Sequence, residues 1–158
     1  MDACAQAQPG CMAAVLRLTA SQVEETCAQI EGAWPVNYNA PGQTVVAMRQ
    51  EAQEALTQKV AALRGRVVPL NVSGGFHSPL MDGAAEGLKR YLESIILTQP
   101  TKPLYANLTA RPYEASSLAD TLAQQAHRPV RWQQSVENML ADGVNAFVRW
   151  GPARPSRG

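Results

Sequence analysis

Between residues 10 and 71 the chain alternates strand-like and helix-like patterns, and glycine or proline separates each pattern from the next. Residues 11–18 are mostly apolar, which predicts a largely buried strand. Thr19 or Ser21 can cap the helix that follows, and Gly32 ends it. The apolar face of this helix is formed by Val23, Cys27 and Ile30.

Two short extended pieces come next, at residues 35–39 and 44–48. The intervening Ala-Pro-Gly-Gln sequence of residues 40–43 favours a tight bend, so we expect a hairpin. Residues 50–63 then repeat apolar side chains near helical spacing, and residues 66–70 are again extended. The apolar positions of this second helix are Ala52, Leu56, Val60 and Leu63.

The resulting order of strand, helix, two strands, helix and strand is the split βαβ arrangement. We therefore predict an α+β fold class in which residues 10–71 form a ferredoxin-like βαββαβ subdomain. This fold hosts many unrelated activities, so by itself it assigns no chemistry.

Residues 72–158 have a different character and are predicted to form a second domain. A long helix is expected over residues 79–96, with Leu80, Ala84, Leu88, Leu92 and Ile95 on its inner side. The later elements are an extended piece at 104–108, a turn at Arg111-Pro112, a helix at 118–126, a helix from Trp132 to about Gly143 and a strand at 146–150. These pieces are too few to close a sheet, so we expect them to be part of a larger α/β layer whose remainder lies upstream.

Charge and cysteine content exclude several classes of protein. A net charge of +1 with scattered arginines gives no basic face for nucleic acid. The three cysteines Cys4, Cys11 and Cys27 lack paired metal-ligand spacing, so no metal site is expected. Without a secretory signal or a membrane-spanning run, the sequence predicts a cytoplasmic protein whose thiols are structural, although any of them could be imagined as a nucleophile.

His77 is the strongest candidate for a catalytic residue. It lies between a strand and a helix, after Gly74 and Gly75, which we expect to let the backbone turn without Cβ clashes. Pro79 fits the first turn of the following helix. The imidazole would be held at an accessible point as a general base near neutral pH. The alternative is a histidine that only caps backbone groups or fills a half-buried niche.

Five segments carry a resemblance to a known family. They are Met-Ala-Ala-Val-Leu at 12–16, Asn-Tyr-Asn-Ala-Pro-Gly-Gln at 37–43, Val-Pro-Leu-Asn-Val-Ser-Gly-Gly-Phe-His-Ser-Pro-Leu-Met at 68–81, Pro-Val-Arg-Trp at 129–132, and Gly143-Val144 with Gly151-Pro152. With these segments in this order, nearly the whole chain resembles the later portion of a malonyl-CoA:acyl carrier protein transacylase. Residues 72–158 would then be an incomplete part of an α/β-hydrolase-like acyltransferase domain.

The resemblance implies that a serine takes malonyl from coenzyme A and passes it to the pantetheine thiol of acyl carrier protein, with no cofactor beyond the substrate malonyl-CoA. His77 matches the family's catalytic histidine, and the main-chain carbonyl of Gln125 matches the group that orients it. The positions that match the acyl-thioester and coenzyme A channel are Asn39, Gln43, Arg66 and Phe76. Alternatively, Asn39 bonds its own turn, Gln43 and Arg66 are solvated surface residues, and Phe76 packs against the pocket wall.

The chain also departs from the family. Its sequence contains no Gly-x-Ser-x-Gly motif, and Ser73 and Ser78 are too close to His77 to replace the nucleophile. The family's malonyl-binding arginine and oxyanion-hole loop would precede Met1. We therefore expect the isolated chain to be inactive unless a companion segment supplies the serine. The alternative is a non-catalytic remnant or a module that binds acyl carrier protein.

Overall fold

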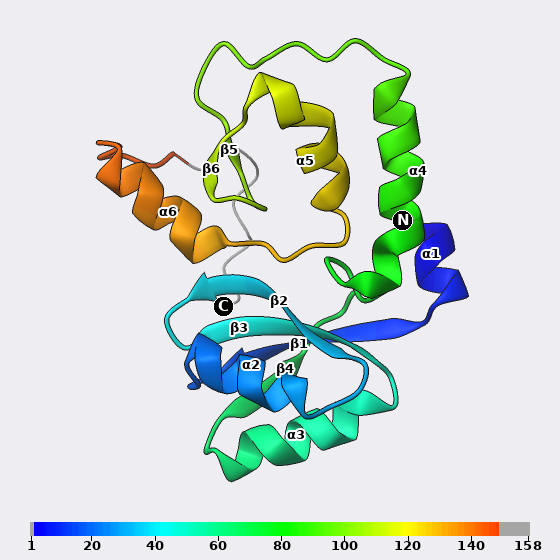
Figure 1. The fold of residues 1–158 in the computed structure, drawn as a ribbon. Helices are drawn as coiled ribbons and strands as arrows, with labels where there is room; N and C mark the ends of the chain where they lie inside the picture. Colours follow the sequence, from blue (N-terminus) through cyan, green and yellow to red (C-terminus); the bar gives the residue numbers. More distant parts are fainter. Residues whose placement is uncertain (1, 149–158) are drawn as a thin grey trace, which may run out of the picture.

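A computed structural model describes residues 2–148 of the chain (Figure 1). The first half contains α1 (Asp2–Ala7), β1 (Gly10–Leu16), α2 (Ala20–Ala28), β2 (Ala33–Ala40), β3 (Gln43–Arg49), α3 (Ala52–Ala62) and β4 (Arg66–Pro69). The second half contains the 3-10 helix η1 (Pro79–Met81), α4 (Asp82–Glu93), β5 (Tyr105–Ala106), β6 (Arg111–Pro112), the 3-10 helix η2 (Ala115–Ser117), α5 (Leu118–Gln124) and α6 (Trp132–Ala141).

The first half is built on a four-stranded sheet in the order β2-β3-β1-β4, in which every neighbouring pair is antiparallel. Figure 1 shows α2 and α3 together on one side of this sheet and the second half of the chain on the other. The four strands and two helices expected between residues 10 and 71 are confirmed.

Both faces of the sheet are covered, which explains why the sequence of β1 is continuously apolar. Successive side chains of a strand point to opposite faces. Accordingly, Ala13 and Val15 pack in the core beneath the helices, whereas Met12 and Ala14 belong to a second cluster on the other face. That second cluster also contains Val36, Val45 and Ala47, with Trp34, Val68 and Phe76 packed against it.

Local sequence explains where the first elements begin and end. The Thr19 side chain accepts a hydrogen bond from the Gln22 amide, and the Gln22 side chain accepts one from the Thr19 amide, which forms a capping box for α2. Pro41 and Gly42 form the two-residue connection between β2 and β3. Gly42 has a φ of 76°, a left-handed conformation that glycine adopts without steric cost.

Several expectations for the helices are wrong in detail. Leu63 is 47% exposed because α3 ends at Ala62 and Arg64 turns the chain with a φ of 61°. The helix expected over 79–96 starts as η1 and ends at Glu93, and it buries Ala85 and Leu92 while Leu88 and Ile95 are exposed. The buried Ala85 and Leu92 are seven residues apart and so lie on nearly the same face of the helix, whereas Ile95 follows its end.

Two strand assignments also need correction, and one helix was missed. Arg111 and Pro112 form β6, which pairs with β5, and the turn lies before them, where Ala110 has a φ of 57°. Residues 146–148 of the expected last strand form no strand, and residues 149 and 150 lie outside the described residues. The short helix α1 was not expected, because its six residues are too few to show a periodic pattern.

Gly10 provides a stability test, because a Cβ at this position would lie 2.6 Å from Leu80 Cδ1 and 3.0 Å from the Met48 carbonyl oxygen. We expect Gly10→Ala to lower the free energy of unfolding by about 1–3 kcal/mol through overpacking. The matched control is Gly87→Ala, since nothing lies within 4 Å of a Cβ at that site in α4. Alanine there should raise the free energy of unfolding by about 0.5–1 kcal/mol. Urea unfolding of both variants measures the difference, and equal stabilities would contradict the close approach of Leu80 to Gly10.

Candidate functional site

His77 lies in the loop between β4 and η1 and adopts a left-handed backbone conformation itself, with a φ of 61°. This corrects the expectation for Gly74 and Gly75, neither of which has a positive φ. Those two glycines are needed for close approach instead. A Cβ on Gly74 would lie 2.7 Å from the Cβ of Ala5, and one on Gly75 would lie 2.7 Å from Leu80 Cδ1.

A left-handed conformation is uncommon for a residue with a side chain, and such strained residues cluster at functional sites. The loop around His77 supplies the interactions that hold it. The buried Ser78 hydroxyl donates to the Gly75 carbonyl at 2.6 Å and accepts from the Leu80 amide at 3.3 Å, which caps η1. The strain therefore falls on a residue whose flanks are fixed on both sides.

The imidazole of His77 is oriented by the end of α5. Its Nδ1 lies 2.7 Å from the Gln125 carbonyl oxygen, and its backbone amide donates to the Ala126 carbonyl at 3.2 Å. A carbonyl oxygen only accepts hydrogen bonds, so Nδ1 must carry the proton. The neutral ring then keeps its lone pair on Nε2, which is the arrangement that a general base requires. His77 is half-buried, as expected for a ring at the edge of a site.

The side-chain amide of Gln125 is hydrogen-bonded through both its oxygen and its nitrogen. Its Oε1 accepts from the Asn107 amide at 3.1 Å, and its Nε2 donates to the Tyr113 hydroxyl at 2.7 Å. Asn107 directly follows β5, and Tyr113 directly follows β6. Sequence reasoning missed both residues, because the signal that connects them to Gln125 is tertiary and no local pattern contains it.

The segment after Gln125 is also fastened to the large sheet. Val130 donates its amide to the Val36 carbonyl at 2.7 Å and accepts from the Tyr38 amide at 2.9 Å. These bonds form a parallel bridge between Asn37 of β2 and Val130. The carbonyl that orients His77 is thus connected through a short stretch of backbone to the edge of the sheet.

The other residues proposed for a substrate channel lie farther from His77. Gln43 and Arg66 flank Leu16 in one row across β3, β1 and β4, and both are exposed. Asn39 is half-buried on β2, next to the same end of the hairpin. The His77 loop lies at the opposite end of β1, where Gly75 is close to Gly10.

The separation follows from the length of β1, whose ends are six residue steps apart, or about 20 Å at roughly 3.4 Å per step. The structure therefore brings Gln125 to His77, but it leaves Asn39, Gln43 and Arg66 at the far end of the sheet. Phe76 directly precedes His77 and packs against the apolar cluster on the sheet face that the second half of the chain covers.

Cys27, Cys11 and the serine beside His77 are poor nucleophiles. Burial, with a smaller contribution from Glu24, raises the pKa of the Cys27 thiol to about 12. Burial and the nearby Glu51 carboxylate also raise the pKa of Cys11. The Ser78 hydroxyl is occupied by its capping bonds, so it is not free to act in place of the family's serine.

Within residues 2–148 no group of three or more His, Cys, Asp or Glu side chains could hold a metal ion. In the same part of the chain no helix has both the length and the apolar character needed to cross a membrane.

Tyr38 donates to Glu24 at 2.7 Å on the helix-covered side of the sheet, and burial together with this bond raises the pKa of its phenol. Tyr38 is therefore not a candidate base.

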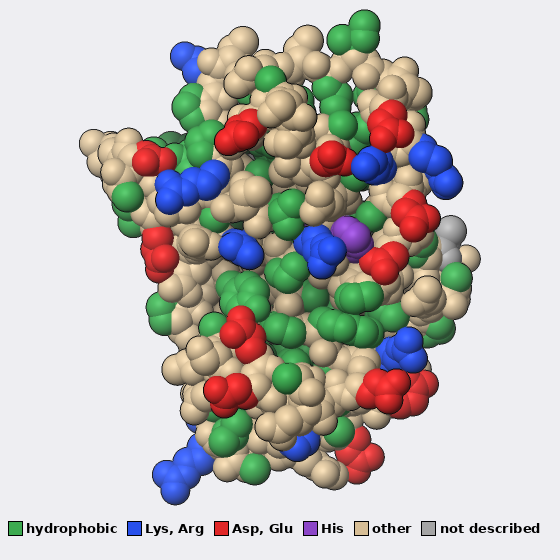
Figure 2. Space-filling view, viewed as in Figure 1, with side chains coloured by type: hydrophobic (Ala, Val, Ile, Leu, Met, Phe, Trp, Pro, Cys, Tyr) green, Lys and Arg blue, Asp and Glu red, His purple; other side chains and the backbone are tan. Residues whose placement is uncertain are grey.

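Figure 2 shows a histidine side chain exposed on the viewed face of the molecule, next to both acidic and basic side chains and beside a band of hydrophobic side chains.

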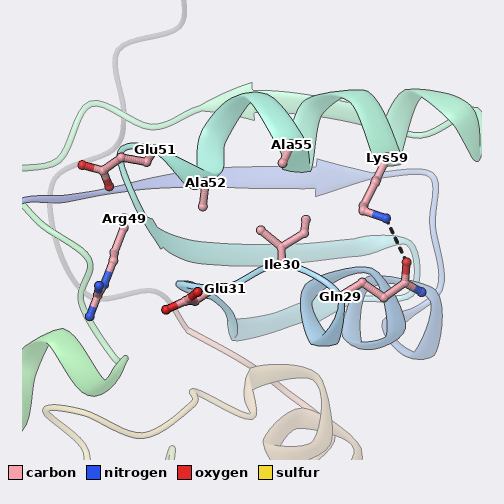
Figure 3. A pocket seen from close by; sticks show the side chains of 8 residues that line it. All are labelled: Gln29, Ile30, Glu31, Arg49, Glu51, Ala52, Ala55 and Lys59. Carbon is pink, nitrogen blue, oxygen red and sulfur yellow. Dashed lines mark hydrogen bonds between the residues drawn. The ribbon is translucent and has the colours of Figure 1, made fainter.

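A separate open hollow lies among α2, β3 and α3. Figure 3 shows Lys59 hydrogen-bonded to Gln29 at one end of this hollow. The charged side chains at the other end are Arg49, Glu31 and Glu51. The Lys59 ammonium donates to the Gln29 amide oxygen at 2.9 Å. None of the expected site residues lines this hollow.

Comparison with known proteins identifies the family to which the chain belongs. The family model described as acyl transferase domain matches residues 3–152. The polyketide-biosynthesis malonyl CoA-acyl carrier protein transacylase of Bacillus velezensis is 36% identical over 151 residues, which cover 92% of this chain and 52% of that protein. The malonyl CoA-acyl carrier protein transacylase of Escherichia coli K12 is 36% identical over 150 residues, which cover 92% of this chain and 48% of that protein.

Solved structures give the same result. The transacylase structure from Streptococcus pneumoniae matches with a TM-score of 0.91 and 31% identity, over 97% of this chain and 52% of that chain. A malonyl-transacylase in complex with a type II polyketide synthase acyl-carrier protein matches with a TM-score of 0.84 and 32% identity, over 89% of this chain and 48% of that chain. The chain thus spans about half the length of the relatives that it matches. The resemblance to malonyl-CoA:acyl carrier protein transacylases is confirmed, and the chain belongs to the acyl transferase domain family.

Proposed function

We propose that this chain supplies the histidine half of an enzyme that moves malonyl from coenzyme A to the pantetheine thiol of acyl carrier protein in fatty acid synthesis. The observation that carries the proposal is the 2.7 Å contact between His77 Nδ1 and the Gln125 carbonyl oxygen. This contact fixes one tautomer of the ring and leaves Nε2 as the base. The names of the relatives, which are malonyl CoA-acyl carrier protein transacylases, support the choice of substrate.

In the proposed reaction, Nε2 of His77 takes the proton of a serine hydroxyl while its oxygen attacks the thioester carbonyl. The carbon–sulfur bond breaks, and the departing coenzyme A thiolate takes that proton back from the imidazolium. In the second half, Nε2 takes the proton of the pantetheine thiol, whose sulfur attacks the malonyl-serine ester. The serine oxygen leaves with the proton, so the enzyme is restored and no cofactor is consumed.

The substrate channel is proposed to run along the face of the sheet that the second half of the chain covers. Arg66 would bind a phosphate of coenzyme A, Asn39 and Gln43 would donate amide hydrogen bonds, and Phe76 would form part of the wall. A separation of about 20 Å along β1 suits a long, flexible thioester whose reactive carbonyl reaches His77 while its phosphates stay at the surface.

The domain organisation is part of the same proposal. We infer that residues 10–71 are a ferredoxin-like subdomain, because the sheet order β2-β3-β1-β4 and the element order β1-α2-β2-β3-α3-β4 agree with the split βαβ pattern. Residues 72–158 would be part of an α/β-hydrolase-like acyltransferase domain. We also propose a cytoplasmic location, since the three cysteines are free thiols and fit a reducing compartment.

The serine is proposed to come from a companion segment that packs against the second half of the chain. Large apolar side chains lie open there, with Ile96 94% exposed and Val148 84% exposed. Others in the second half are Leu104, Trp132, Leu140 and Phe147. Exposed apolar surface of this extent usually marks an interface. Relatives of about twice the length support the same interpretation.

The test is a loading assay with radiolabelled malonyl-CoA. We expect the chain alone to take up no covalent label, because its sequence lacks the Gly-x-Ser-x-Gly nucleophile. Fusion to the upstream half of the E. coli relative should restore loading and transfer to acyl carrier protein. Covalent label on a serine of the isolated chain would overturn the companion requirement.

A second candidate is a non-catalytic module that binds acyl carrier protein. The observation that favours it is the matching structure of a transacylase in complex with an acyl-carrier protein. Under this hypothesis the isolated chain binds acyl carrier protein, but the fusion transfers no malonyl.

A further inference from the structure

Three consecutive residues just after α5 contact His77 or the start of α4, the helix that follows the His77 loop. The Gln125 carbonyl accepts from the His77 ring, and the Ala126 carbonyl accepts from the His77 amide. The third contact comes from His127, whose Nδ1 lies 2.6 Å from Asp82 Oδ1. The loop is therefore held at both ends, at His77 and five residues later at Asp82.

The pair of Asp82 and His127 is geometrically defined. Asp82 is the first residue of α4, and its amide donates to the Pro79 carbonyl, so its backbone is fixed to the η1 turn. An ionised carboxylate only accepts hydrogen bonds, so Nδ1 of His127 is the donor. The His127 side chain is only 20% exposed, whereas that of Asp82 is 58% exposed. The imidazole is thus the more buried member of the pair.

We propose that Asp82 and His127 are positioning residues that hold the Gln125 carbonyl in register with the His77 ring. His127 follows Gln125 by two residues, so a displacement of one displaces the other. Neither side chain touches the reacting atoms. The catalytic meaning of this clamp rests on the function proposed above, but its effect on the His77 ring does not.

The same two helices carry a natural control. Helices α4 and α5 pack against each other (Figure 1), and Lys89 of α4 lies 2.8 Å from Asp120 of α5. Asp120 is 55% exposed, close to the 58% of Asp82. Each ion pair contains an exposed aspartate. The Lys89–Asp120 pair joins α4 to α5, and the Asp82–His127 pair joins α4 to the residues just after α5. Only the Asp82 pair adjoins the His77 loop. A purely structural role would make the two aspartates equivalent.

The experiment uses the full chain labelled with ¹⁵N-histidine, which gives a simple spectrum because the sequence contains two histidines. In Asp82→Asn we expect the Nδ1 proton of His77 to exchange with solvent about fivefold faster, the upper range for losing an exposed ion pair. The share of His77 with its proton on Nδ1 should fall as well. Asp120→Asn should change neither quantity.

Variants of His127 provide the second arm. His127→Ala should reproduce the effect of Asp82→Asn, whereas His127→Asn should largely rescue it, because its amide nitrogen lies near the former Nδ1 position. Backbone amide spectra identify any variant that fails to fold. The inference is overturned if both Asp82→Asn and His127→Ala leave the His77 ring unchanged, or if Asp120→Asn alters it equally.

In the fusion enzyme the clamp predicts a fall in kcat of about fivefold for Asp82→Asn with KM unchanged, since the lost interaction acts on the base and not on substrate binding. The two proposals fail separately. An inactive fusion with an altered His77 ring in Asp82→Asn would sink the function and leave the clamp standing. An active fusion with an unchanged ring and kcat in Asp82→Asn would sink the clamp alone.

Discussion

His77→Ala in the fusion with the upstream half of the E. coli relative is expected to lower kcat for malonyl transfer by about 10²–10⁴-fold. A positioned general base contributes a factor of this size to proton transfer. The geometry supports the upper part of the range, because Nδ1 is already committed to the Gln125 carbonyl and alanine leaves no other group on that loop to accept the serine proton.

The measurement is single-turnover transfer of labelled malonyl to acyl carrier protein. The matched control is Gln124→Ala, since this exposed side chain neighbours Gln125 without contacting His77 and should leave kcat within a factor of two or so. A fusion in which His77→Ala retains the rate of the parent would show that another group is the base.

Leu56→Ala is expected to give the largest loss of stability, about 2–5 kcal/mol in the free energy of unfolding. Leu56 of α3 is fully buried in the core between the helices and the sheet, and its truncation leaves a cavity that a packed core closes only partly. Urea unfolding followed by circular dichroism measures the change.

Leu63→Ala is the control for the same substitution at the residue that follows the last turn of α3. Leu63 lies just after α3 and is 47% exposed, so its truncation should cost no more than about 0.5 kcal/mol. A similar loss at Leu63 would show that the residue after α3 is packed in the core as well.

Local patterns were enough to predict the elements between residues 10 and 71. The capping box at Thr19, the Pro41-Gly42 bend and the continuous apolar run of β1 are all properties of neighbours in sequence. The second half was less predictable, because β5 and β6 have two residues each and their pairing depends on tertiary contacts. A strand of that length has no periodicity to detect.

The residues of the candidate site can also be divided into those that the sequence predicted and those that it did not. His77 could be singled out from its position between a strand and a helix, and Gln125 came only through the family resemblance. The left-handed backbone of His77 could not be predicted, because the adjacent glycines were the natural choice for that conformation and instead allow close packing. Asn107, Tyr113 and the pair of Asp82 and His127 are joined by contacts between distant segments, which no single stretch of sequence encodes.

The bridge between Val130 and β2 has a consequence for self-association. β2 is an edge strand of the four-stranded sheet, and an uncovered edge strand offers unpaired amides and carbonyls to another chain. Here the outward Val36 carbonyl and Tyr38 amide are already bonded to Val130. The backbone that follows the Gln125 carbonyl therefore also prevents a strand of another chain from pairing with β2. Loosening this stretch would expose the edge of β2 to such pairing and would also release the His77 imidazole from the Gln125 carbonyl.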